Sequence, residues 1–144
     1  MMSRILFLSC VSLVIFSSIQ ATEKIVWSGE VFSDGKPTMA IPLSHHKKYQ
    51  IRAKGFVNLG KWIKNREPLA NDACYEFSKS GSIEKLESLK NSSGISICKG
   101  NYNPDHTYYS EPFEPKENII HFWVHDTDYT DNADAFQIQI VEVE

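Results

Sequence analysis

The chain has 144 residues, of which 42% are hydrophobic and 23% are charged, a composition typical of one globular domain and not of a disordered chain. Its net charge of −3 and its pI of about 5.9 argue against a nucleic-acid-binding protein, because such domains usually have a pI above roughly 9. The mean hydropathy of −0.31 excludes a multi-span membrane protein.

The N-terminal residues 1–21 have the pattern of a cleaved signal peptide. Arg4 is positive, residues 5–16 are mostly apolar, and Ala21 is a small residue suited to cleavage. The apolar stretch is shorter than the 20 or so residues of a membrane span, although an uncleaved anchor is the alternative. We therefore expect a secreted or periplasmic protein, free of the membrane after cleavage, with residues 22–144 as a single domain. Removing Arg4 changes the net charge to −4.

Two of the three cysteines, Cys74 and Cys98, belong to this predicted mature chain. An even number of cysteines in an exported protein predicts a disulfide, and two buried free thiols are the alternative.

The first half of the mature chain consists of short, partly alternating apolar runs separated by turn signals. Such runs predict strands over residues 25–32, 39–43, 49–53 and 56–63, with a Gly-Pro-containing turn at 34–37. Residues 25–32 form either one long bent strand or a pair of strands.

Residues 64–94 differ, because they are rich in charges and hold turn residues. Ile83, Leu86 and Leu89 recur at helical spacing and predict a short surface helix, with a loop covering the domain as the alternative.

The last third returns to the strand pattern. We expect a strand at 95–98, a long ordered loop with three prolines at 99–117, and strands at 119–124 and 136–143. The sum predicts an all-β fold, a β-sandwich with jelly-roll-like connections.

An acidic loop lies between the last two predicted strands. It holds four aspartates and an asparagine within nine positions: Asp126, Asp128, Asp131, Asn132 and Asp134. Calcium takes six to eight oxygen ligands from carboxylates, amides and carbonyls, and this loop offers all three. The loop lacks the order of an EF-hand, and its scarcity of soft ligands disfavours zinc. A solvated turn rich in Asp and Asn is the alternative.

The loop also resembles a family, the PA-I-type galactophilic lectins, which are small soluble bacterial lectins with a galactose-binding-domain-like jelly-roll fold. The order Asp, aromatic, Asp-Asn and then Phe136 at the start of an alternating strand is similar to the calcium loop of that family. Residues 27–31 (Trp-Ser-Gly-Glu-Val), 53–60 (Ala-Lys-Gly-Phe-Val-Asn-Leu-Gly) and 66–68 (Arg-Glu-Pro) resemble three further family stretches in the same order.

The resemblance implies a calcium ion that coordinates two vicinal hydroxyls of galactose. The implied metal ligands are the side chains of Asp126, Asp131 and Asn132, the carbonyl of Leu59, and a carbonyl near Tyr129 or Thr130. The implied sugar-binding residues are Asp126, Asp131, Asn132, Thr127, Pro68 and Asn71.

The chain also departs from the family pattern. Its loop is shorter between Asp126 and Asp131, Pro68 falls near the position of a family histidine, and residues 72–94 resemble an insertion. The resemblance therefore favours calcium more than it favours galactose.

No catalytic constellation is found, so we do not expect an enzyme. The function predicted first is an exported calcium-dependent carbohydrate-binding protein whose partner is a galactoside-like glycan; the sequence leaves a homo-oligomer open. The alternative is an exported structural or protein-interaction β-sandwich module without sugar binding.

Overall fold

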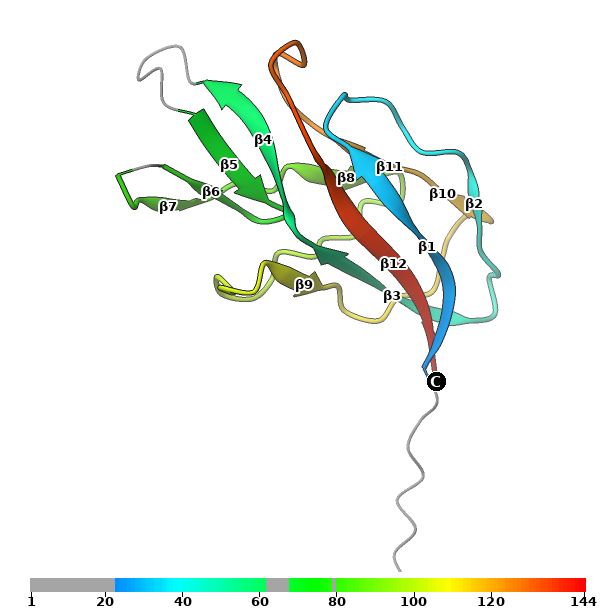
Figure 1. The fold of residues 1–144 in the computed structure, drawn as a ribbon. Helices are drawn as coiled ribbons and strands as arrows, with labels where there is room; N and C mark the ends of the chain where they lie inside the picture. Colours follow the sequence, from blue (N-terminus) through cyan, green and yellow to red (C-terminus); the bar gives the residue numbers. More distant parts are fainter. Residues whose placement is uncertain (1–22, 62–67, 79) are drawn as a thin grey trace, which may run out of the picture.

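The computed structural model describes residues 23–61, 68–78 and 80–144. This part of the chain forms twelve strands and no helix, which confirms the all-β prediction (Figure 1). It therefore holds no helix long and apolar enough to cross a membrane. The predicted signal peptide and residues 62–67, with the end of one predicted strand and most of the family stretch at 66–68, lie outside the described residues.

The strands are short and antiparallel. In chain order they are β1 (Lys24–Phe32), β2 (Ile41–Pro42), β3 (Lys48–Lys54), β4 (Phe56–Lys61), β5 (Pro68–Asp72), β6 (Tyr75–Phe77), β7 (Ile83–Lys85), β8 (Leu89–Asn91), β9 (Thr107–Tyr109), β10 (Ile119–Ile120), β11 (Phe122–Val124) and β12 (Ala135–Val143). They form two four-stranded sheets, β1-β12-β3-β9 and β4-β5-β6-β7, and two strand pairs, β10-β2 and β11-β8.

Strand β12 lies at the centre of the first sheet, between β1 and β3. Its predicted alternation is confirmed, because Phe136, Ile138 and Ile140 are fully buried whereas Gln137 between them is exposed. In an antiparallel sheet with one solvated face, this period of two places every second side chain in the core.

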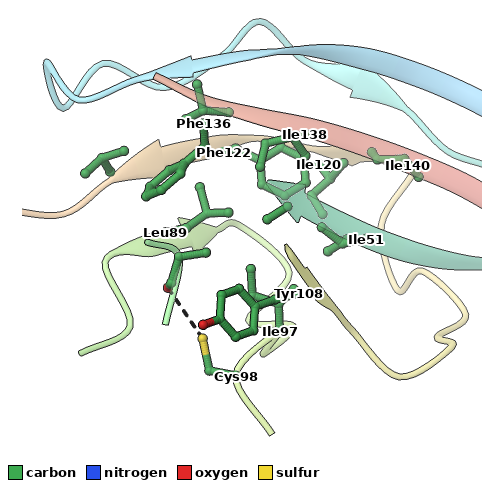
Figure 2. Packing of buried hydrophobic residues seen from close by; sticks show 14 of the residues in the cluster. Ile51, Leu89, Ile97, Cys98, Tyr108, Ile120, Phe122, Phe136, Ile138 and Ile140 are labelled. Atoms are coloured by element: carbon green, nitrogen blue, oxygen red, sulfur yellow. Dashed lines mark hydrogen bonds between the residues drawn. The ribbon is translucent and has the colours of Figure 1, made fainter. Parts of the chain in front are cut away.

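The core lies between this sheet and the two strand pairs. Figure 2 shows Phe136 and Ile138 of β12 close to Phe122 and Ile120 from the opposite layer. The ring of Trp27 in β1 stacks on that of Phe122, with centroids 6.1 Å apart. Each such side chain stabilises the fold by roughly 1.5–3 kcal/mol on burial. The architecture is therefore sandwich-like.

The second sheet continues from the first through a bend at Gly55. This residue has a φ of 96°, a conformation that glycine adopts without strain, and its amide donates to the carbonyl of His106. The chain thereby leaves β3 and enters β4, whose residue Val57 pairs with Asn71 of β5.

The predicted helix around Ile83 is wrong. Ile83 lies in β7 and Leu89 in β8, and the two do not share a buried face: Ile83 and Leu86 are exposed, whereas Leu89 is buried opposite Val124 of β11. Pairing with other strands overrides the local spacing, which carries no information about distant partners.

The predicted strand at 95–98 is also wrong. The side chain of Asn91 donates to the carbonyl of Ile95 (2.7 Å) and accepts from its amide (3.0 Å), so a side chain replaces a strand partner there. Conversely, the predicted loop at 99–117 contains the short strand β9.

Two predicted strands are shorter than expected. Only Ile41 and Pro42 pair within residues 39–43. The strand at 119–124 is divided at His121, because its amide donates to Ser92 and its ring contacts the carbonyl of Thr38 instead.

The predicted disulfide between Cys74 and Cys98 is confirmed, with Cα atoms 5.3 Å apart. In the chain-entropy model, closing a loop of this length stabilises the fold by about 3 kcal/mol. The bond ties the base of the segment containing β6, β7 and β8 to the core, since both cysteines are buried.

Candidate functional site: the acidic loop

The acidic loop, residues 126–134, is fixed at its C-terminal end to two neighbouring segments. Asn58 of β4 and Ala133 exchange both backbone hydrogen bonds, at 3.0 and 2.9 Å. The side-chain nitrogen Nδ2 of Asn132 donates to the carbonyl of Ser33, just after β1, at 2.8 Å. The loop is therefore held by β4 on one side and by the end of β1 on the other.

A close approach between β4 and the loop occurs at Gly60. This glycine has a φ of 79°, and a Cβ there would overlap the carboxylate of Asp131. The β4-β5 register shifts between Asn58 and Lys61, so Leu59 and Gly60 leave the regular ladder beside the loop. This bulge places the backbone of Leu59, an implied carbonyl ligand, in the segment that meets Asp131.

The first half of the loop is ordered by Tyr129. Its hydroxyl accepts from the amide of Asp126 at 3.1 Å, and its ring covers Gly35, where a Cβ would come within 2.6 Å of the ring. The amide of Thr127 donates to Oδ1 of Asp126 at 2.6 Å.

Asp128 is satisfied within the loop itself. Its Oδ1 accepts from the hydroxyl of Thr130 at 2.7 Å and from the amide of Thr130 at 2.9 Å. These two hydrogen bonds hold the pKa of the Asp128 carboxyl below its usual value. Asp128 therefore has a local structural partner in Thr130.

Two oxygens of the loop differ from those of Asp128. Oδ2 of Asp126 and Oδ1 of Asn132 are buried and have no hydrogen-bond partner within the described residues. An unsatisfied buried polar atom costs about 1–3 kcal/mol, so native proteins rarely retain one without a reason. Carboxylate and amide oxygens are the donors that calcium prefers, and both residues belong to the implied ligand set.

The implied calcium ligands include few negatively charged groups. Within the described residues, no three His, Cys, Asp or Glu side chains gather as a metal site. The implied set contains only two carboxylates, from Asp126 and Asp131, so the amide of Asn132 and backbone carbonyls would supply the other ligands. Such a mixed oxygen shell suits calcium and disfavours softer metals.

The structure leaves the other implied sugar-binding residues farther apart. Asn71 is 1% exposed, and neither of its amide atoms has a hydrogen-bond partner among the described residues. Strand β4 lies between it and the loop, because Asn71 pairs with Val57 and Asn58 pairs with Ala133. Pro68 begins strand β5.

Sequence reasoning missed a second polar centre, at Asp72. This carboxylate is fully buried at the end of β5. Its Oδ1 accepts from the amides of Cys74 (2.8 Å) and Tyr75 (2.7 Å). Its Oδ2 accepts from the hydroxyl of Tyr108 at 2.7 Å and lies 3.1 Å from Nδ1 of His106. The available signal was the Asx-turn pattern, in which an Asp side chain caps amides two and three residues later.

Aromatic rings surround this centre. The ring of His106 packs edge-on against Phe56, Phe77 and Tyr102, with centroids 5.1–6.1 Å apart. Burial, followed by the hydrogen bond to Asp72, raises the pKa of the Tyr108 hydroxyl above its usual value. Since every Asp72 oxygen has partners, the network is a structural one.

Comparison of the chain with protein-family models, curated proteins and solved structures gives no match.

Proposed function

We propose that this protein is an exported calcium-dependent carbohydrate-binding protein, lectin-like in function and with a galactose-binding-domain-like jelly-roll fold. The observation that carries the proposal is a pair of buried oxygens, on Asp126 and Asn132, that have no hydrogen-bond partner in the part of the chain that the structure describes. Both lie on one loop that is fixed to β4, and both are donor types that a hard cation accepts.

The cation would be held by the side chains of Asp126, Asp131 and Asn132, with backbone oxygens from Leu59 and from the Tyr129–Thr130 segment. Calcium bound there supplies open coordination positions for sugar hydroxyls. The loop is ordered around these ligands by Tyr129 and Ser33, so the ligands need little rearrangement.

Galactose is the first sugar to test, because the resemblance implies a vicinal diol on the ion. The loop carboxylates of Asp126 and Asp131 would accept hydroxyl protons from that diol in charge-assisted hydrogen bonds. Thr127 is exposed next to Asp126 and can contact the sugar rim. Pro68 and Asn71 contribute less to this proposal, since they lie on β5 beyond β4.

A glycan array probed in millimolar calcium and again in EDTA tests this function. We expect galactoside binding that is stronger in calcium than in EDTA, and we expect Asp126→Ala to remove this calcium-dependent part. Asp128→Ala is the matched control, because that carboxylate is satisfied by Thr130, and it should retain binding. Glycan binding that is equal in calcium and EDTA, or absent in both, would overturn the proposal. Absence would favour the protein-interaction module.

A further inference from the structure

A shallow hollow lies on the solvent face of the first sheet, beside the bend into β4. It has a volume of about 810 Å³, and its wall and rim residues include Phe32, Lys54, Phe56 and Asp134. Both phenylalanines are exposed, Phe32 by 56% and Phe56 by 54%. Two large apolar rings therefore line the same hollow and remain open to solvent.

Register explains how the hollow forms. Phe32 pairs with Ala135 on the same face of the sheet, and Lys54 pairs with Gln137. The small side chain of Ala135 leaves space beside Phe32, and Gly55 leaves more, since a Cβ there would meet no atom within 4 Å. Gaps at these two small residues separate the two rings.

One ring of the hollow is packed against a neighbouring ring, and the backbone beside the other ring is hydrogen-bonded. Phe56 packs edge-on against the ring of His106, with centroids 5.6 Å apart. Phe32 precedes Ser33, whose amide and hydroxyl both donate to the carbonyl of Asp134, at 3.1 and 3.0 Å. A ring that is already held in place loses less entropy when a ligand binds, and this applies to Phe56.

The hollow also carries hydrogen-bonding groups of both kinds. Nε2 of Gln137 donates to Glu30 at 2.7 Å, which orients the Gln137 side chain so that its oxygen remains available as an acceptor. Lys54 offers a donor and Asp134 an acceptor at the rim. Aromatic faces attract the weakly positive C–H groups of a pyranose ring, and flanking polar groups bind its hydroxyls.

We propose that this hollow is a second carbohydrate subsite, which binds a neutral pyranose residue without calcium. The rim holds two carboxylates, Glu30 and Asp134, against one ammonium group, Lys54, so anionic sugars are disfavoured. Asp134 and Ala135 directly follow the acidic loop, so a glycan of several residues can extend from the loop into the hollow. The subsite uses none of the implied calcium ligands and can be tested separately from them.

The test is the glycan array in EDTA, followed by ligand-observed saturation-transfer NMR on the strongest neutral glycan. We expect EDTA-resistant binding that Phe32→Ala and Phe56→Ala each weaken about tenfold, the loss of one aromatic contact. Met39→Ala is the control, because Met39 is 89% exposed and does not line the hollow. Asp126→Ala should leave this binding unchanged.

The subsite proposal would be overturned if the affinity in EDTA is the same in the wild type and in both phenylalanine variants. It would also be overturned if no glycan binds in EDTA. Binding confined to uronic-acid or sulfated glycans would contradict the assigned ligand class. Failure of the calcium site leaves a different pattern: no calcium response, with EDTA-resistant binding that still depends on Phe32 and Phe56.

Discussion

Asp72 and Asp126 each have buried carboxylate oxygen atoms, but they differ in whether these oxygens have hydrogen-bond partners. Asp72 is fully buried, and both of its oxygens have partners from the chain itself. Asp126 has one oxygen bonded to Thr127, while its other oxygen is buried without a partner among the described residues. A carboxylate whose partners are internal stabilises the fold. A carboxylate that keeps a buried oxygen unpartnered costs stability unless something from outside binds it.

The largest expected effect is a loss of stability when Asp72 is replaced. Asp72→Ala should lower the free energy of unfolding by about 3–5 kcal/mol, because it leaves the buried donors around it without an acceptor. Urea unfolding followed by tryptophan fluorescence measures this loss. Asp72→Asn keeps one acceptor, so its free energy of unfolding should fall by less. This variant can be measured if the alanine variant fails to fold. Asp105→Ala, at an exposed position nearby, should change stability by less than about 0.5 kcal/mol. A loss below about 1 kcal/mol in Asp72→Ala would show that the network does not stabilise the fold.

A smaller effect is expected where β4 meets the loop. Gly60→Ala combines a strained positive φ with overlap of the Asp131 carboxylate, and should cost about 2 kcal/mol as well as weaken calcium binding. Gly94→Ala is the matched control, because Gly94 has a φ of 65° but open space around it. It should show the backbone strain alone, about 1 kcal/mol, with calcium binding unchanged. Equal losses in both variants would mean that the loop does not press against β4.

The smallest effect is a pH dependence at Tyr108. Its pKa in the folded state lies above the unfolded value of about 10, so its contribution to stability is complete below pH 10 and is lost as the pH rises further. The free energy of unfolding should therefore fall more steeply above pH 10 in the wild type than in Tyr108→Phe. The limiting difference in slope is about 1.4 kcal/mol per pH unit. Urea unfolding from pH 8 to 11 measures it, with the exposed neighbour Tyr109→Phe as control. Identical slopes in all three proteins would contradict the raised pKa of Tyr108.

Much of the central sheet could be predicted from the sequence. The alternation in residues 136–143 and 49–53 marks strands with one buried face, and both lie in the first sheet. The segment around Ile83 could not be predicted in the same way. Its three-residue spacing indicates a helix, but Leu89 is buried only because a strand distant in sequence, β11, pairs with β8. Periodicity describes one element, and such pairings are set by the rest of the fold.

The acidic loop and the Asp72 centre also differ in how far apart their residues lie in the sequence. The oxygen-rich spacing of residues 126–134 marks the loop locally, so it could be singled out from sequence. Asp72 could not, because its partners His106 and Tyr108 lie 34 and 36 residues away. The burial of Asn71, whose amide atoms have no partner within the described ranges, likewise depends on the packing of strands, which the sequence does not display.

Thermal unfolding of the wild type and of Asp126→Ala, in calcium and in EDTA, tests the central claim most directly. A ligand at 100 times its Kd stabilises the folded state by about 2.7 kcal/mol, so saturating calcium should raise the Tm of the wild type by several degrees. Asp126→Ala should lose that increase. In EDTA its Tm should equal or exceed that of the wild type, since the substitution removes a buried oxygen that has no partner among the residues described by the structure. Equal Tm values for the wild type in calcium and in EDTA would contradict the account.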